Sequence, residues 1–579
     1  MTLRALSVAF PVVALSIALS ACGGTSEPPP EVDDDLPLPL VPGPAPTPPM
    51  GWSSWNGYST HISDAIVRQT ADVMVSSGMR DLGYVYVNID DGWEAADRAA
   101  DGSLQAGAGF PNGIAAVADY VHGLGMKLGI HNDRGNETCA MFPGTLGHAM
   151  QDAMNYAAWG VDYFKYDNCA TEMNTNTIDQ DYIEMGQDLT AATQTLGRTP
   201  IVYSICAWKF YEWSVGLGSL WRTSADIRPA WTTTEPNAAG VADILVNNQG
   251  LGAYAGPNGW NDPDMLEVGN TSAYAGVPSL TDTEQVSHFT MWAISASPLI
   301  AGTNLVSMTD ATKNILTNAE IIAIDQDAMG LQGAMVSHQV VTATGMEKDV
   351  SIWAKPLNES GARAVVLLNS GPTPQDITVQ FKDVGLRAGS AKVRDLWAHA
   401  DRGSFSDKVT ATAVPSHGVV AFKIVGSEPT KPKGTAFLSD LTWTYASNNL
   451  GPIEKDTNVG ATAAGDGTPL TIRGAAYTKG LGMGAPAAAI FRLAQNCSTF
   501  HAEVGVDDVT KGAGSVDFQV WADGVLLFDS GVVTGMSPVV PIDVSVVGVR
   551  RLKLLVTATP DGPSLDRADW GNASVDCAD

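Results

Sequence analysis

The stretch Val161–Cys169 (VDYFKYDNC) places a lysine and an aspartate two residues apart at the end of an apolar run. Side chains two residues apart in a strand point to the same face, so Lys165 and Asp167 are expected to enter one site. A buried parallel strand that ends on one charged group is typical of the mouth of a barrel. Asp167 is therefore a candidate reactive carboxylate. Taken alone, the run also fits a strand that ends in an exposed aspartate.

Other strand-like runs between residues 50 and 330 also stop on polar side chains. They are Gly83–Ile89 before Asp90 and Asp91, Lys127–Ile130 before His131, Ile201–Ile205 before Cys206, Leu220–Ala225 before Asp226, and a turn at 257–261 before Asp262 and Asp264. Amphipathic segments such as Ile66–Met79 and Gly113–Leu124 lie between them. This alternation predicts an α/β fold, a (β/α)8 TIM barrel over residues 48–330, with its site at the carboxyl ends of the strands.

A cluster of carboxylates at a barrel mouth suits either glycoside hydrolysis or a divalent metal. Six tryptophans are interleaved with the cluster: Trp52, Trp55, Trp93, Trp208, Trp221 and Trp260. Aromatic faces bind the apolar faces of sugars and carboxylates bind their hydroxyls, so the pattern favours a glycosidase without metal or other cofactor. About half of these tryptophans are expected to be core residues.

The composition narrows the classes of molecule that the protein is expected to bind. The chain has 579 residues and a formal net charge of -29, from 33 basic and 62 acidic residues. Such a balance argues against nucleic acid and anionic membranes, because phosphate binding needs clustered lysine and arginine. A neutral carbohydrate substrate fits better.

The N-terminus indicates export. Arg4 precedes the apolar run Ala5–Ile17, and Leu19-Ser20-Ala21-Cys22 resembles a bacterial lipobox, so residues 1–21 are expected to be removed and Cys22 to carry a lipid anchor. An ordinary secretory signal is the alternative, and both export the protein. The Pro- and acid-rich residues 22–47 are predicted to be an extended spacer.

The second half of the chain has short alternating strands. Residues 331–426, with runs such as Ala364–Leu368 and Val419–Ile424, predict an antiparallel β-sandwich. A linker is expected at 427–434 and a further all-β module at 435–579. In an oxidising compartment we expect the disulfides Cys139–Cys169 and Cys497–Cys577, which leaves Cys206 as a buried thiol.

Five motifs in order resemble glycoside hydrolase family 27, the family of α-galactosidases and α-N-acetylgalactosaminidases. They are Met50–Asn56 (MGWSSWN), Asn88–Trp93 (NIDDGW), Lys165–Cys169 (KYDNC), Trp221–Ile227 (WRTSADI) and Gly259–Met265 (GWNDPDM). The resemblance covers about residues 47 to 426 and includes the Cys139–Cys169 disulfide.

The resemblance implies a retaining exo-glycosidase acting on terminal α-linked D-galactose by double displacement. Asp167 would be the nucleophile, with a lowered pKa beside Lys165, and Asp226 the acid/base, with a raised pKa. The resemblance also implies a set of sugar contacts: Asp90 and Asp91 at the 4- and 6-hydroxyls, Lys165 at the 3- and 4-hydroxyls, Trp55 at the far side of the sugar, and Arg222 and Asp264 completing the pocket.

Three positions depart from the family. His131 stands where members usually have tyrosine, and Ala207 stands where α-galactosidases usually have the glutamate that reads the 2-hydroxyl. Ala207 would admit a 2-acetamido group, whereas the bulky Phe210 would fill that space, so N-acetylgalactosaminidase and β-L-arabinopyranosidase remain alternatives, beside a surface glycan-binding protein without activity. His131 is expected to bind a sugar hydroxyl rather than to be purely structural or to transfer protons. Finally, Cys206 has no partner nearby in the sequence.

The last module resembles the NPCBM carbohydrate-binding family. The likeness rests on Phe437–Leu441 (FLSDL), Lys479–Gly482 (KGLG), Ala502–Asp508 (AEVGVDD) and Ala568–Trp570 (ADW). It implies a glycan ligand, and the alternative is a domain that only stabilises the enzyme. Asp507 and Asp508 match no calcium loop.

Overall fold

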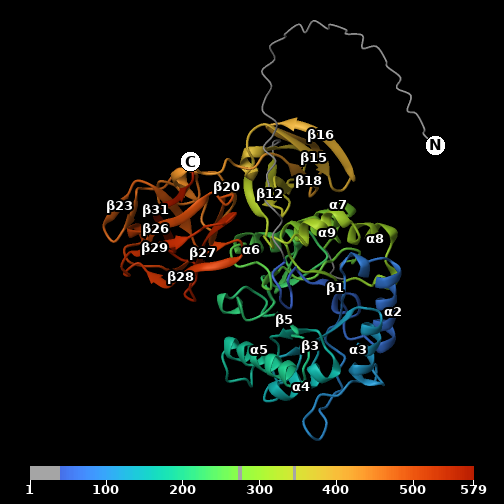
Figure 1. Cartoon of the computed structure of the whole chain (residues 1–579). Coiled ribbons are helices and arrows are strands. Elements are labelled where there is room, and N and C mark those ends of the chain that lie inside the picture. Colours follow the sequence, from blue (N-terminus) through green and yellow to red (C-terminus); the bar gives the residue numbers. More distant parts are fainter. Residues whose placement is uncertain (1–39, 272–276, 343–346) are drawn as a thin grey trace, which may run out of the picture. The chain divides into compact units, whose positions relative to one another are not determined.

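The computed structural model describes residues 40–271, 277–342 and 347–579, which belong to one compact unit (Figure 1). The predicted signal peptide, Cys22 and most of the predicted spacer lie outside these residues. Within the described ranges, no helix combines the length and the apolarity needed to cross a membrane.

The first half is a curled sheet of eight parallel strands, in the order β10-β1-β2-β3-β4-β5-β6-β9. Their bounds are β1 Met50–Ser53, β2 Tyr86–Ile89, β3 Lys127–Asp133, β4 Tyr163–Asp167, β5 Val202–Ile205, β6 Leu220–Arg222, β9 Trp260–Asp262 and β10 Leu299–Ala301. A parallel bridge between Leu266 and Ala301 joins the two edges, and the Leu266 N–H donates to the Ile300 carbonyl at 2.7 Å. The predicted barrel fold is therefore confirmed.

Helices follow the strands around the sheet. They are α1 Trp55–Tyr58, α2 Asp64–Ser76, α3 Gly113–Gly123, α4 Ala149–Trp159, α5 Ile178–Thr195, α6 Val241–Asn248, α7 Asp282–Ile294, α8 Asp310–Leu316 and α9 Ala319–Asp325. Gly160 ends α4 with a left-handed φ of 84°. Glycine adopts that conformation without a Cβ clash, which lets the chain turn directly into β4.

Some predicted strand bounds shift. β2 begins at Tyr86 rather than Gly83, because Gly83 has a φ of 106° and closes the turn after Arg80. β3 continues past His131 to Asp133, since Asp133 pairs in register with Asp167 of β4. β6 ends at Arg222, before the predicted Ala225.

The structure corrects the predicted end of the spacer, because the chain is already folded onto the barrel before residue 47. Ala45 is buried, its N–H donates to Asn258 Oδ1 at 3.1 Å, and its carbonyl accepts from Trp260 Nε1 at 2.9 Å. These contacts attach the chain to the barrel at β9, so the segment around Ala45 is part of the folded body rather than of an extended tether.

Two antiparallel sheets follow the barrel. One has the order β11-β12-β13-β18-β15-β16 and the other pairs β14 with β17. Their bounds are β11 Ala334–Val341, β12 Lys348–Pro356, β13 Ala362–Asn369, β14 Gln375–Gln380, β15 Ser390–Asp395, β16 Ala400–Ser406, β17 Lys408–Val414 and β18 Val419–Val425. Along β13, Val365 and Leu367 enter the core of the sandwich, while Val366 and Leu368 join the barrel core. Burial of both faces explains its unbroken apolar run.

The last module is a second sandwich (Figure 1). One sheet has the order β21-β24-β31-β26-β29, with β19 also paired to β31; the other has the order β20-β25-β30-β27-β28. Their bounds are β19 Gly434–Phe437, β20 Trp443–Asn448, β21 Glu454–Lys455, β24 Gly480–Gly484, β25 Ala487–Arg492, β26 Cys497–Val506, β27 Ser515–Ala522, β28 Val525–Thr534, β29 Val540–Ser545, β30 Arg551–Ala558 and β31 Arg567–Cys577. The predicted all-β class is confirmed.

Candidate active site

Strand β4 brings Lys165 and Asp167 into one site, as the alternation of the strand predicts. The Lys165 Nζ lies 3.5 Å from Asp167 Oδ2 and 3.0 Å from Asp90 Oδ2, which follows β2. One ammonium group therefore pairs with two buried carboxylates, from the ends of β2 and β4 on either side of β3. Oδ1 of Asp167 accepts from the Asn168 N–H at 2.9 Å, which fixes the orientation of the carboxylate.

The two aspartates after β2 are held by different partners. Asp90 Oδ2 accepts from Ser53 Oγ at 3.2 Å, at the end of β1. Asp91 Oδ1 and Oδ2 accept from Thr138 Oγ1 at 2.9 Å and from the Ala140 N–H at 2.8 Å, in the loop after β3. Asp90 thus lines the pocket, whereas both oxygens of Asp91 already accept protein hydrogen bonds.

A second ion-pair group lies on the opposite side of the pocket. The Arg222 Nη2, at the end of β6, lies 2.8 Å from Asp264 Oδ2 and 3.2 Å from Asp226 Oδ1. The Asp226 side chain is 47% exposed, whereas that of Asp264 is 6% exposed. Asp226 is therefore the carboxylate of this group that solvent and a leaving group can reach.

The environments of Asp167 and Asp226 move their pKa values in opposite directions. Burial would raise the pKa of Asp167, but the charges of Lys165 and His131 outweigh burial and hold that pKa well below its usual range. Burial raises the pKa of Asp226; Arg222 opposes this rise, and the charges of Asp264 and Asp167 add to it. One carboxylate is thus kept ionised beside another that is favoured to hold a proton.

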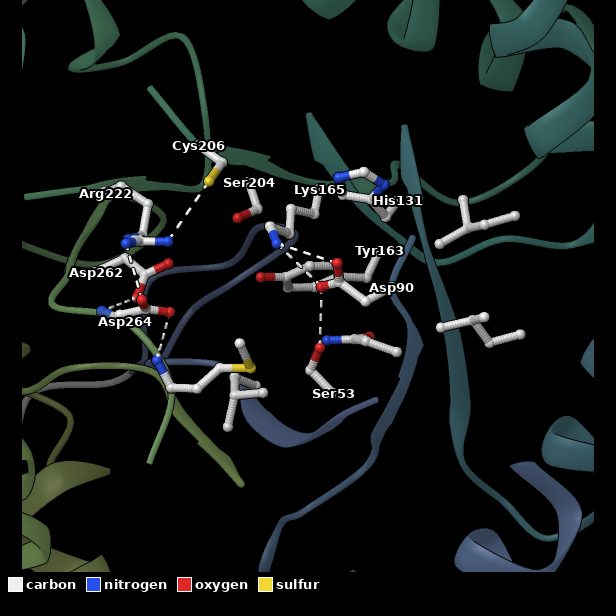
Figure 2. A pocket seen from close by; sticks show the side chains of 15 residues that line it. Ser53, Asp90, His131, Tyr163, Lys165, Ser204, Cys206, Arg222, Asp262 and Asp264 are labelled. Carbon is white, nitrogen blue, oxygen red and sulfur yellow. Dashed lines mark hydrogen bonds and ion pairs between the residues drawn. The ribbon is translucent and has the colours of Figure 1, made fainter. Parts of the chain in front are cut away.

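Figure 2 shows the two sides of this pocket: Ser53, Asp90, His131 and Lys165 gather on one side, and Cys206, Arg222, Asp262 and Asp264 on the other. Of the predicted site residues, Asp90, His131, Lys165, Arg222 and Asp264 line it. Asp167 and Asp226 are connected to these lining residues by ion pairs, Asp167 with Lys165 and Asp226 with Arg222. Asp91, Trp55, Ala207 and Phe210 are not among its lining residues.

Comparisons with known proteins identify the relatives of this chain. Residues 47–327 match the family described as α-galactosidase A. The chain is 41% identical to an α-galactosidase of Cyamopsis tetragonoloba over 64% of this chain and 84% of that protein. It is 40% identical to α-galactosidase A of Cellvibrio japonicus, over 66% of this chain and 92% of that protein.

The chain belongs to glycoside hydrolase family 27.

Further matches of this family 27 chain are a solved structure and two family models in its second half. Among solved structures, α-galactosidase I of Mortierella vinacea aligns with a TM-score of 0.60 at 32% identity, over 66% of this chain and 98% of that one. Residues 347–424 match the α-galactosidase C-terminal β-sandwich domain, and residues 434–576 match the NPCBM/NEW2 domain. The resemblances drawn from the sequence are confirmed.

Two residues that the sequence analysis considered for the 2-position of the sugar, Ala207 and Phe210, follow β5. Ala207 is buried two residues after the strand. The Phe210 ring packs against Tyr254 in a tilted arrangement with ring centroids 4.7 Å apart, and the Tyr254 hydroxyl accepts from the Ala558 N–H of β30 at 3.3 Å. The Phe210 ring thus has a protein partner of its own, and its predicted sugar contact stays a prediction.

The predicted disulfides are both present. Cys139–Cys169 joins the loop after β3 to the chain two residues after Asp167. Cys497–Cys577 joins the first residue of β26 to the last residue of β31. Cys206 is a buried free thiol, as expected. Of the six tryptophans, Trp52, Trp93, Trp221 and Trp260 are core residues, Trp55 is half-buried, and Trp208 is exposed.

Sequence reasoning gave no role to the pocket residues Ser53, Tyr163 and Ser204, and it placed Asp262 in the carboxylate cluster without a role of its own. Ser53 ends β1, a strand too short to recognise from its four residues. Burial raises the pKa of Asp262 to about 6, with Arg222 opposing the rise and Asp264 adding to it. Asp262 Oδ1 accepts from the Asp264 N–H at 2.9 Å and so helps to position Asp264.

Two groups within the described residues have metal-ligating side chains close together. Asp133, Cys139 and Cys169 form one, but its cysteines are already joined in a disulfide. Asp91, Glu94 and His131 form the other, and all three are buried. The Glu94 carboxyl accepts from the Gly92 N–H at 3.2 Å and from Asn132 Nδ2 at 3.3 Å, so protein donors already occupy both of its oxygens.

Proposed function

We propose that this family 27 enzyme is a retaining exo-glycosidase that releases terminal α-linked D-galactose by double displacement. The observation that carries the proposal is the divergence of two neighbouring carboxyl groups, with the pKa of Asp167 lowered and that of Asp226 raised. A retaining glycosidase needs an ionised nucleophile beside a protonated acid. The relatives named α-galactosidase support the choice of sugar.

In the first step, an Asp167 oxygen attacks the anomeric carbon while the bond to the leaving oxygen breaks. Asp226 gives its proton to that oxygen, which leaves as an alcohol. Lys165 stays paired with Asp90 as the Asp167 charge is consumed, since its Nζ lies closer to Asp90. The product of this step is an ester between Asp167 and the sugar.

In the second step, Asp226 accepts a proton from water, and the water oxygen attacks the anomeric carbon. The bond to Asp167 breaks, its electron pair returns to the carboxylate, and the sugar leaves with the anomeric configuration of the substrate. Arg222 stabilises ionised Asp226 between the two steps, at 3.2 Å. Exposure of the Asp226 side chain gives water a path to it.

The sugar contacts belong to the same proposal. Asp90 and Lys165 line the pocket and would bind the 4- and 3-hydroxyls, with Asp91 behind Asp90. Such groups reject an analogue whose hydroxyl is missing or turned, because buried polar atoms would be left unpaired. Trp55, Arg222 and Asp264 would complete the enclosure.

A second candidate substrate differs from the galactoside in the group at the 2-position of the sugar. The Ala207 side chain supplies no acceptor for a 2-hydroxyl, and the Phe210 ring packs against Tyr254. This pair of observations favours α-N-acetylgalactosaminide as the alternative substrate. β-L-arabinopyranoside, which lacks only the 6-hydroxymethyl group of galactose, is the remaining one.

The test is release of p-nitrophenol from α-D-galactopyranoside, α-N-acetylgalactosaminide and β-L-arabinopyranoside, with Asp167→Ala and Asp226→Ala as controls. Fast release from the galactoside, lost in both variants, is expected. Release from the N-acetylgalactosaminide alone would identify that compound, instead of the galactoside, as the substrate. No release from any of them would favour a glycan-binding protein without activity.

We further propose that the C-terminal module binds a glycan and that Cys22 carries a lipid after export. Titration of the inactive Asp167→Ala protein with galactose-containing oligosaccharides should show a second site besides the pocket; one site only would leave the module a stabilising role. Labelling with radioactive palmitate should mark wild-type protein and not Cys22→Ala. Unlabelled wild-type protein in the medium would instead indicate an ordinary secretory signal.

A further inference from the structure

His131 lies in β3 with one ring nitrogen directed at the proposed nucleophile. Its Nε2 is 3.4 Å from Asp167 Oδ2, and its side chain is 2% exposed. The His131 carbonyl accepts from Trp93 Nε1 at 2.9 Å, which fixes the backbone that carries the ring. The ring therefore reaches Asp167 in the free enzyme, where the sequence suggested only a contact with substrate.

The second ring nitrogen is also buried, and two further acids lie near the ring. Within the described residues, Nδ1 of His131 is buried without a hydrogen-bond partner. One ring nitrogen of His131 and one carboxyl oxygen each of Asp91 and Glu94 lie within 4.8 Å of one another. His131 thus reaches Asp167 through Nε2 and also lies close to the buried pair Asp91 and Glu94.

Such surroundings favour the doubly protonated imidazole. The titratable groups that face it are Asp90, Asp91 and Glu94 from the segment after β2, Asp133 from β3, and Lys165 and Asp167 from β4. Burial lowers the pKa of His131, but the charge of Asp90 and the hydrogen bond to Asp167 outweigh it and raise that pKa to about 9, against the opposing charge of Lys165. A metal ion in place of the second proton would have to displace the donors that already bind both oxygens of Asp91 and Glu94.

We propose that His131 is a positioning residue that stays an imidazolium throughout the reaction, orients the Asp167 carboxylate for attack and stabilises it as the leaving group when the glycosyl ester is hydrolysed. The inference rests on the proposed function. His131 neither gives nor takes a proton in either step: the protons pass through Asp226, and the electron pair of the ester bond returns to Asp167. The imidazolium acts by placing a positive charge where negative charge reappears.

The test compares the pH dependence of activity in His131 variants with that of a control variant at another histidine that pairs with an aspartate. His131→Gln and His131→Tyr remove the charge, and the tyrosine variant has the residue usual in the family at this position. His122→Gln is the control, because His122 Nε2 forms another pair with an aspartate, Asp162, at 2.8 Å, just before β4 and at its opposite end from Asp167. Each protein is assayed with a galactoside from pH 3 to 8, and kcat is compared for a substrate with a good leaving group, for which ester hydrolysis limits the rate.

Loss of the His131 charge should move the acid limb of kcat/KM upward by about 1 to 3 pH units, because an opposite charge at this distance lowers a carboxyl pKa by that amount. It should also reduce kcat more than kcat/KM for the activated substrate. His122→Gln should leave the acid limb unchanged. An acid limb that coincides with that of the wild type in folded His131 variants would overturn the proposal, however far their overall activity falls.

A measurement on the wild-type enzyme separates the inference from the proposed function. Long-range 1H–15N NMR reports the protonation of each imidazole, and the His131 signals are those missing from His131→Tyr. Both ring nitrogens should be protonated at pH 7 without substrate. A neutral His131 at pH 7 would overturn the inference even if the enzyme hydrolyses galactosides, whereas an imidazolium in a protein without activity on any substrate would count against the proposed function alone.

Discussion

Buried aspartates in the barrel mouth and in the C-terminal module have opposite environments. In the barrel, Asp90 lies 3.0 Å from the Lys165 ammonium nitrogen, and Asp264 lies 2.8 Å from a guanidinium nitrogen of Arg222. In the module, Asp569 is fully buried in β31, neither of its oxygens accepts a hydrogen bond from the described residues, and its neighbour is Asp507. Burial and the adjacent Asp507 raise the pKa of Asp569 well above its usual range.

The difference shows what a buried carboxyl needs in order to react. Without a cation, burial favours the neutral acid, and Asp569 shares its environment with another acid. With Lys165 and His131 beside it, Asp167 remains an anion although it is also buried. Cations at the strand ends therefore distinguish the proposed reactive carboxylates of the barrel from Asp569 of the module.

The largest effect should come from Asp167→Asn. The amide cannot form the glycosyl ester, so kcat/KM for the galactoside should fall by about 10⁴-fold or more. Asp569→Asn is the matched control, a buried aspartate of the other region, and its kcat/KM should equal that of the wild type. Comparable losses in both variants would remove the functional distinction between the two regions.

Asp226→Asn should lose about 10² to 10⁴-fold with an ordinary glycoside, because general acid catalysis contributes that much. In the wild type, kcat/KM should decline as pH rises through the raised pKa of Asp226, since the group must hold its proton to protonate the leaving oxygen. A basic limb that survives in Asp226→Asn, measured with a dinitrophenyl galactoside that needs no acid, would assign it to another group.

Lys165→Met should reduce kcat/KM by about 10² to 10³-fold, the effect of removing one preorganised charge. It should also lower the free energy of unfolding by about 3 kcal/mol, because two buried carboxylates lose their cation. Urea unfolding measures this change. Lys479→Met, which breaks exposed pairs with Asp440 and Asp456 in the module, should leave both quantities unchanged. Equal destabilisation by the two variants would contradict the argument from burial.

The smallest effect concerns stability in the module. The pKa of Asp569 is raised in the folded state, so its contribution to stability is present at low pH and is lost as pH rises through that pKa. Asp569→Asn removes this titration and should be more stable than the wild type at pH 8 by about 1 to 3 kcal/mol, with a smaller difference at pH 4. Urea unfolding at both pH values would show the trend; a variant that is less stable at pH 8 would indicate an ionised, stabilising Asp569.

The sequence predicted those features that depend on local pattern. The period-2 alternation of β4 was enough to place Lys165 beside Asp167, and strand ends gave Asp90, Asp226 and Asp264. The strands β1, β9 and β10 have too few residues for a periodicity, so Ser53 was missed. The direction of the His131 ring depends on the register between β3 and β4, where His131 pairs with Lys165, and no local pattern encodes that register.

Contacts across the module were equally hidden from the sequence. Asp507 and Asp569 come together because β26 and β31 pair side by side, which no spacing along the chain reveals. The adjacent Asp507 and Asp508 were the more conspicuous pair. Yet the Asp508 oxygens accept from the backbone N–H groups of Arg473 and Gly474, so Asp508 serves the β22–β23 hairpin (β22 Leu470–Ile472, β23 Ala475–Tyr477) instead.

The position of β31 has a consequence for biosynthesis. This strand is the last of the described strands, yet it pairs with β19, β24 and β26 and lies inside its sheet. The module therefore cannot complete that sheet until Arg567–Cys577 has left the ribosome, whereas the barrel has all of its strands by Ala301. A nascent chain cut short before Arg567 would carry a finished catalytic barrel attached to a module in which β19, β24 and β26 lack this partner strand. Such unpaired strand edges are ready templates for aggregation.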